Sequence, residues 1–134
     1  MKIYDAKLIT LDGRMDEPIW QEVPEYGDFK RIGCEGGNPS EEQTVFKILP
    51  CEDRIIFGVK CLEPVSMEGA IACKNAKTAF ATNSVQIFLS PDGTTFNYYL
   101  FCCAMDGRKE NLYYEEAGNI QPDPFNPEWE FAVY

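Results

Sequence analysis

The chain has 134 residues, of which 45% are hydrophobic and 13% aromatic, so it is long enough for one core and too apolar to be disordered. Its formal net charge of −10 repels a phosphate backbone, which argues against nucleic acid as a partner. No segment approaches the about 20 apolar residues of a membrane span, so we expect no membrane partner either.

The N-terminal residues carry charges where a secretion signal needs an apolar run. The chain as given is therefore expected to be cytoplasmic, or extracellular if a signal has been removed. Its six cysteines match no metal-binding spacing. We expect reduced thiols, with one or more disulfides as the alternative. These cysteines are Cys34, Cys51, Cys61, Cys73, Cys102 and Cys103.

Short runs of alternating apolar residues predict strands along most of the chain, and no amphipathic helix of convincing length is present. Two long stretches between them, residues 23–43 and 63–83, are predicted to be loops, as is the proline-rich segment 115–127. In chain order the expected strands are a weak one at residues 3–9, then 44–49, 55–62, 84–89, 96–104, 109–114 and 128–134.

Turn sequences separate these strands, at residues 50–53, at 91–93 and at Asp106-Gly107. Asp-Gly suits the positive φ angles of tight hairpins, so the strands should pair antiparallel. The pattern predicts an all-β fold: one domain over residues 1–134, an antiparallel β-sandwich with immunoglobulin-like or jelly-roll-like layers and long end loops.

A hairpin closed at Asp92-Gly93 would set the register of the central strands. The expected pairs are Leu89 with Phe96, Ile87 with Tyr98, and Val85 with Leu100, all on one apolar face. The opposite face would interleave aromatic rings with amides and a carboxylate, a mixture suited to sugars. The alternative is that the long loops cover this second face. Its candidate ligand residues are Gln86, Asn97, Tyr99, Glu110 and Tyr114.

Residues 11–20, Leu-Asp-Gly-Arg-Met-Asp-Glu-Pro-Ile-Trp, resemble the opening motif of family 9 carbohydrate-binding modules, I-D-G-x-x-D-E-x-x-W. Residues 44–48 and 51–61 look like the family's paired strands around an acidic turn. Residues 83–93 resemble its next signature, D-S-V-E-I-F-L-D-P, with Gln86 and Ser90 in place of acids. The similarity continues through residues 96–107.

This resemblance implies a β-sandwich of the wider DOMON-like group, whose branches bind sugars or heme. Heme ligation usually needs a histidine, and the chain has none. The sugar branch implies an oligosaccharide or polysaccharide partner, a linked glycoside hydrolase, and a sugar-contacting cation near Lys74 or Lys77. No cofactor is expected except structural calcium, for which the candidate ligands are Asp16, Glu17, Asp53 and Asp92.

The family domain normally continues beyond the point that corresponds to Tyr134, so the resemblance implies a domain truncated at its C-terminus or a short member. Either would leave a strand edge unpaired, and we expect a homo-oligomer or a further segment to cover it. Of the two tryptophans, Trp20 is expected to pack in the core, whereas Trp129 fits the core and a ligand platform equally.

Without histidine, the usual Ser-His and Cys-His pairs are impossible, so we expect no catalytic residue. The leading hypothesis is a non-catalytic carbohydrate-binding module that uses Gln86, Asn97, Tyr99, Glu110, Tyr114, Trp129 and Lys77. The second is a structural or protein-interaction β-sandwich without sugar binding, which the scarcity of tryptophan favours. The third is a glycoside hydrolase, which needs only two carboxylates from the set Asp106, Glu110, Glu115 and Glu116.

Overall fold

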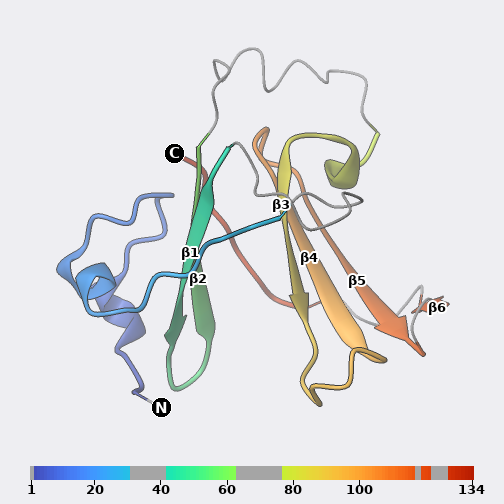
Figure 1. The fold of residues 1–134 in the computed structure, drawn as a ribbon, viewed down its shortest axis with the longest axis horizontal. Coiled ribbons are helices and arrows are strands. Elements are labelled where there is room, and N and C mark those ends of the chain that lie inside the picture. The colour runs from blue at the N-terminus through green and yellow to red at the C-terminus, as the bar shows by residue number, and fades with distance from the viewer. Residues whose placement is uncertain (1, 31–41, 63–76, 117–118, 122–126) are drawn as a thin grey trace. The chain divides into compact units, whose positions relative to one another are not determined.

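The computed structural model describes residues 2–30, 42–62, 77–116, 119–121 and 127–134. The strands form a two-stranded sheet and a four-stranded sheet, both antiparallel (Figure 1). In these ranges, three short 3-10 helices lie between the strands in the sequence or before them. The all-β class is thus confirmed. The chain divides into two compact units, Met1–Pro64 with Tyr134 and Val65–Val133. The sandwich and the single domain stay predictions.

The first unit contains the 3-10 helices η1 (Ala6–Leu8) and η2 (Pro18–Gln21) and the strands β1 (Thr44–Pro50) and β2 (Ile55–Cys61). The strand expected at residues 3–9 is wrong. Asp5 caps η1 there by accepting a hydrogen bond from the Lys7 amide at 3.0 Å, which turns the chain. Only a single bridge, between Tyr4 and Cys51, joins that segment to the sheet.

Trp20 forms the centre of the first core, with 2% of its surface exposed. Glu17 orients the indole, because its Oε2 accepts a hydrogen bond from Trp20 Nε1 at 2.9 Å while its Oε1 accepts one from the Thr10 amide at 2.7 Å. Pro18 begins η2 without losing an intrahelical donor. The packing role expected for Trp20 is confirmed. The other buried residues of this core are Ile19, Val23, Leu49 and Cys51.

Gly58 on β2 lies directly beneath Trp20. A Cβ atom there would approach Trp20 Cη2 to 2.9 Å and Met15 Cε to 2.8 Å, so only glycine lets the indole lie against the sheet. Opposite Gly58, the side chain of Lys47 reaches η2 and its Nζ donates to the Trp20 carbonyl at 2.8 Å. The N-terminal motif is therefore secured to the hairpin from both strands.

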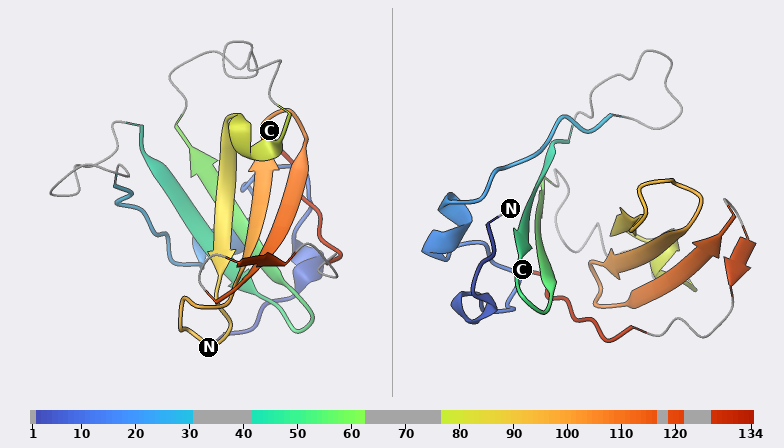
Figure 2. Two further views of the ribbon diagram at one scale, coloured as in Figure 1. Left: turned by 90° about the vertical axis from the view of Figure 1, so that its right-hand side faces the viewer. Right: turned by 90° about the horizontal axis from the view of Figure 1, so that it is seen from below.

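The second unit is the four-stranded sheet, in the order β3-β4-β5-β6 (Figure 2). Its strands are β3 (Ser84–Leu89), β4 (Tyr98–Ala104), β5 (Lys109–Glu115) and β6 (Asn119–Gln121). The 3-10 helix η3 (Ala79–Ala81) precedes β3 and buries Ala79 against Cys102 and Ala104. Strand β6 was not expected, since its residues fall in the predicted proline-rich loop.

Residues 128–134 do not form the expected strand. Their alternation is nevertheless real, because Trp129 and Phe131 are half-buried between exposed Glu128 and Glu130. The Trp129 ring packs edge-on to Phe101 at 5.3 Å, so this segment runs across a face of the sheet and not beside a strand. Alternation reports one-sided burial, which does not require strand pairing.

The register of β3 and β4 differs from the prediction by three residues, since Leu89 pairs with Tyr99 and not with Phe96. The connection is wider than a two-residue turn. Ser90 accepts the Gly93 amide through its carbonyl at 3.2 Å, and Thr95 then takes a φ of 64° before β4 begins. An odd shift moves every β4 side chain to the other face relative to β3.

The β4–β5 hairpin at Asp106-Gly107 is confirmed, but its register differs by one residue from that of a two-residue turn, which would pair Cys103 with Glu110. The Ala104 amide donates to the Arg108 carbonyl at 2.9 Å, and Gly107 has a φ of 88°, which makes a three-residue loop. Consequently Cys102, and not Cys103, pairs with Glu110.

The observed registers define two faces of this sheet. The Tyr99 face consists of Val85, Ile87, Leu89, Tyr99, Phe101, Cys103, Lys109, Asn111 and Tyr113. The Leu100 face consists of Ser84, Gln86, Phe88, Tyr98, Leu100, Cys102, Ala104, Glu110, Leu112, Tyr114 and Ile120.

The four described cysteines form no disulfide in this structure: Cys51, Cys61, Cys102 and Cys103. Reduced thiols stay a prediction. Cys34 and Cys73 lie outside the described residues. Among the described residues, no helix has the length and apolarity to cross a membrane.

Candidate functional site

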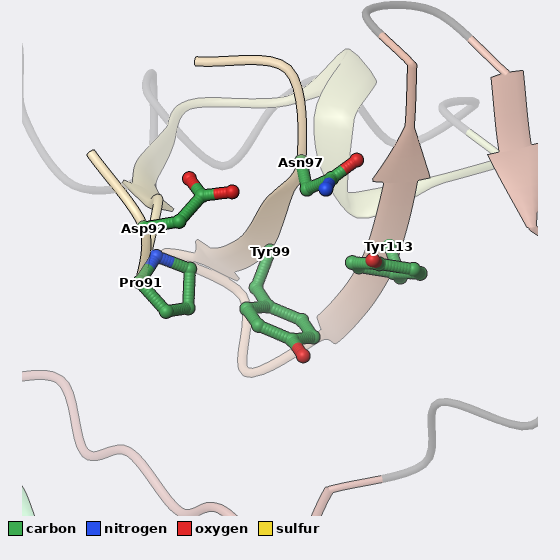
Figure 3. Close-up of a pocket in the computed structure, with 5 residues that line it drawn as sticks. All are labelled: Pro91, Asp92, Asn97, Tyr99 and Tyr113. Carbon is green, nitrogen blue, oxygen red and sulfur yellow. The ribbon is translucent and has the colours of Figure 1, made fainter. Parts of the chain in front are cut away.

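A small cavity opens on the second unit where the β3–β4 loop meets the ends of β4 and β5 (Figure 3). Its volume is about 190 Å³. Pro91 and Asp92 come from the loop, Asn97 from the residue before β4, Tyr99 from β4 and Tyr113 from β5. The cavity thus combines two phenol rings, a carboxylate and an amide.

The two tyrosines stand together because their strands place them directly opposite each other. Their ring centroids are 4.9 Å apart and the ring planes meet at 30°, an offset cross-strand stack. Both side chains are half-buried. One face of each ring is turned to the other ring, and both side chains also line the cavity.

Asp92 is held by hydrogen bonds within the loop. Its Oδ1 accepts from the Thr94 amide at 2.9 Å, from the Thr94 hydroxyl at 2.7 Å and from the Ser90 hydroxyl at 3.0 Å. The Thr94 amide, followed by the two hydroxyls, lowers the pKa of the Asp92 carboxyl below its ordinary value. Asp92 is therefore a fixed negative charge at the mouth of the cavity.

Asn97 connects the two ends of the site. Its carbonyl accepts the Ser90 hydroxyl at 3.1 Å, and its Oδ1 accepts the Glu116 amide at 3.3 Å. Because Oδ1 is the acceptor, the amide nitrogen of Asn97 is directed toward the side of the tyrosines (Figure 3). Asn97 can then donate to a ligand while Asp92 accepts.

Uncommon backbone conformations occur on both sides of the site. Thr95 in the loop and Glu116 after β5 both have positive φ angles, which are uncommon for residues with a side chain.

The protonation of Tyr113 is set by its surroundings. Burial raises the pKa of the Tyr113 hydroxyl, with smaller contributions from Glu115, Tyr99 and Asp92. Tyr113 therefore stays protonated at neutral pH.

The observed registers split the expected ligand platform. Asn97 and Tyr99 lie at the cavity, whereas Gln86, Glu110 and Tyr114 lie on the Leu100 face. The predicted single face that combined all five is wrong. The cause is the pair of register shifts, each by an odd number of residues.

The remaining expected ligand residues have structural contacts. Trp129 Nε1 donates to Asn111 Oδ1 at 3.0 Å, and the Lys109 amine lies 5.0 Å from the centre of the Trp129 ring. Lys77 is exposed just before η3 and does not line the cavity. Lys74 lies outside the described residues.

Two of the carboxylates considered for glycoside hydrolysis are bound by the protein itself. Glu110 Oε1 accepts the Ala79 amide at 2.5 Å, which fixes η3 on the sheet. Asp106 pairs with Arg108, whose guanidinium holds the pKa of that carboxyl below its ordinary value. Glu115 and Glu116 are exposed near the end of β5.

In the described ranges, no three or more Cys, Asp or Glu side chains gather into a group that could hold a metal ion. Among the expected calcium ligands, Glu17 contacts Trp20, Asp53 pairs with Arg54, and Asp92 is bound by its own loop. Asp16 is exposed. Calcium binding therefore stays a prediction.

Sequence reasoning missed that Tyr113 and Asp92 line the same site as Tyr99. The signal that could have found this site is a three-residue loop at residues 105–107, in place of a two-residue turn at Asp106-Gly107, because it sets Tyr113 opposite Tyr99.

Comparison with models of known protein families, with curated proteins and with solved structures found no match to the chain.

Proposed function

We propose that the protein is a non-catalytic module that binds a saccharide at the cavity lined by Asp92, Asn97, Tyr99 and Tyr113. The observation that carries the proposal is the convergence of two stacked tyrosines with the Asp92 carboxylate and the Asn97 amide around about 190 Å³ of space. The C–H face of a sugar ring can lie on an aromatic ring, and its hydroxyls need both donors and acceptors.

The cavity supports a particular kind of sugar. Drug-sized ligands occupy about 300–1,000 Å³, so this smaller space fits one ring, such as a chain end or a branch. Asp92 is the only charged group among the described lining residues, and the whole chain carries −10. Neutral sugars are therefore favoured over acidic ones, whose carboxylates Asp92 would repel.

The test is calorimetric titration with glucose, galactose, xylose and their β-1,4-linked disaccharides. We expect binding of a neutral sugar that weakens strongly in Tyr99→Ala and Tyr113→Ala. Asp92→Asn should weaken it about tenfold or more, since a hydrogen bond to a charged group contributes about 1.5–3 kcal/mol.

The sheet provides matched controls on its other face. Tyr98 and Tyr114 form a stacked cross-strand pair with centroids 4.6 Å apart, one residue along each strand from the pair in the cavity. Tyr98→Ala and Tyr114→Ala should leave sugar affinity nearly unchanged. The proposal fails if no sugar binds, or if the two pairs of variants weaken binding equally.

The second candidate is a protein-interaction module, which exposed apolar side chains on the Leu100 face favour. Phe88 is 57% and Ile120 50% exposed on that face. Phe88 also packs against Tyr98, with ring centroids 5.7 Å apart. Silence toward every sugar in the titration would favour this candidate over the first.

A further inference from the structure

Strand β3 forms one edge of the four-stranded sheet, since among the described strands its only neighbour is β4. Its six residues, Ser-Val-Gln-Ile-Phe-Leu, include no charge and no proline. Charges, prolines and bulges are the devices that normally protect an edge from pairing with another chain. Strand β6 at the other edge has only three residues.

The backbone groups that point outward from β3 can be deduced from one hydrogen bond. The Met105 amide donates to the Asn83 carbonyl at 3.0 Å, so Asn83 directs its backbone groups toward β4. Because this direction alternates along a strand, Val85, Ile87 and Leu89 also face β4. The N–H and C=O groups of Ser84, Gln86 and Phe88 therefore point away from the sheet.

We propose that a second copy of this chain pairs with this edge, antiparallel, about a two-fold axis through Gln86. The pairs would be Gln86 with Gln86 of the second copy, and Ser84 with Phe88 in both directions. Every outward-facing residue of β3 then meets an outward-facing residue, and the two four-stranded sheets become one.

Other registers satisfy fewer groups. A shift by one residue sets outward-facing residues opposite residues that face β4, which leaves the edge unsatisfied. A two-fold axis through Ile87 pairs Gln86 with Phe88 but sets Ser84 opposite Ser90, which lies beyond β3 and whose hydroxyl is bound in the loop. The axis through Gln86 uses the whole strand.

The edge itself favours a second copy as the occupant, because about the two-fold axis each outward-facing residue of β3 meets an outward-facing residue of an identical strand. Two chains of −10 each repel one another, and an uncharged strand is where they can approach most closely. Gln86 is exposed, and Phe88 is 57% exposed beside it. In the proposed pair Phe88 would lie against Ser84 of the second copy, which covers part of its ring.

The first test is analytical ultracentrifugation of the full chain over a range of concentrations. We expect a concentration-dependent dimer that Gln86→Pro abolishes while the β-type circular dichroism remains. The N–H removed at Gln86 faces outward, where proline is tolerated on an edge strand. Ile87→Pro instead removes an N–H that faces β4 and should disrupt the sheet itself.

Cross-linking tests the register. Opposite residues of a hydrogen-bonded pair have Cα atoms about 5.5 Å apart, within the about 4.4–6.8 Å that a disulfide spans. In a Cys61→Ser background, Gln86→Cys should form an intermolecular disulfide at that residue under mild oxidation. Phe88→Cys alone should not, whereas Phe88→Cys mixed with Ser84→Cys should.

A control variant separates the edge from the rest of the sheet: Ile120→Lys on β6 should leave the dimer intact. A protein that is monomeric at every concentration, or a dimer that survives Gln86→Pro, would overturn the proposal. A dimer that Ile120→Lys breaks would overturn it as well. So would a disulfide that joins residue 88 of one copy to residue 88 of the other in Phe88→Cys alone. None of these results depends on sugar binding.

Discussion

At the scale of single residues, two acids of the N-terminal motif, Asp12 and Glu17, bind the chain's own backbone and core. Asp12 accepts the Arg14 amide at 2.9 Å in a turn where Gly13 has a φ of 86°. Glu17 binds the Trp20 indole and the Thr10 amide. These two acids of residues 11–20 therefore stabilise the turn at Gly13 and orient the buried Trp20.

Asp92 gives a prediction in acid. Its folded-state pKa is lowered from 3.8, chiefly by the Thr94 amide, so its carboxylate contributes stability above pH 3.8. That contribution should be lost as the pH falls through the lowered folded value. We expect the free energy of unfolding, measured in urea from about pH 5 to about pH 2, to decline less in Asp92→Asn than in the unmodified protein. An identical decline in both would contradict the role assigned to these hydrogen bonds.

At the scale of elements, two short loops decide which side chains share a face. The β3–β4 loop and the β4–β5 loop each displace the register by an odd number of residues from a two-residue hairpin. Tyr99 and Tyr113 consequently meet on one face, while Tyr98 and Tyr114 meet on the other. A sheet with aromatic pairs on both faces can present a binding site on one and an interaction surface on the other.

The packing of η2 against β2 gives a stability prediction. Gly58→Ala would set a Cβ atom 2.9 Å from Trp20 Cη2, and because the indole is buried it cannot yield freely. Overpacking of this kind costs about 1–3 kcal/mol, so the free energy of unfolding in urea should fall by that amount.

Gly27→Ala is the matched control. Its added Cβ would lie 3.5 Å from Val45 Cγ1, an ordinary contact, and stability should change by less than about 1 kcal/mol. Equal losses in the two variants would show that the close approach of Trp20 to Gly58 does not limit packing.

At the scale of the whole molecule, the net charge of −10 governs association. Raising the salt concentration from about 0.1 M to about 1 M shortens the screening length from about 10 Å to about 3 Å. Repulsion between two acidic chains then weakens, so the dissociation constant of the proposed dimer should fall, as ultracentrifugation can measure. A dimer that weakens with salt would instead indicate ion pairs across its interface.

Much of the architecture could be predicted because it depends on local patterns. Alternation located β1, β2, β3 and β5, and the turn sequences at Pro50 and Asp106 located two hairpins. The N-terminal motif correctly predicted a buried Trp20. Even the erroneous strand at residues 128–134 began with a true alternation of burial over residues 128–131, where Trp129 packs against Phe101.

The sequence by itself thus determined the all-β class and the hairpin positions, because these follow from a period of two and from local turn chemistry, and its N-terminal motif indicated the burial of Trp20. Only the tertiary structure decided the registers, and with them the grouping of Asp92, Asn97, Tyr99 and Tyr113. The physical reason is that one extra loop residue reverses every side chain of the next strand. That choice rests on backbone angles such as φ of 64° at Thr95, which residue identity leaves open.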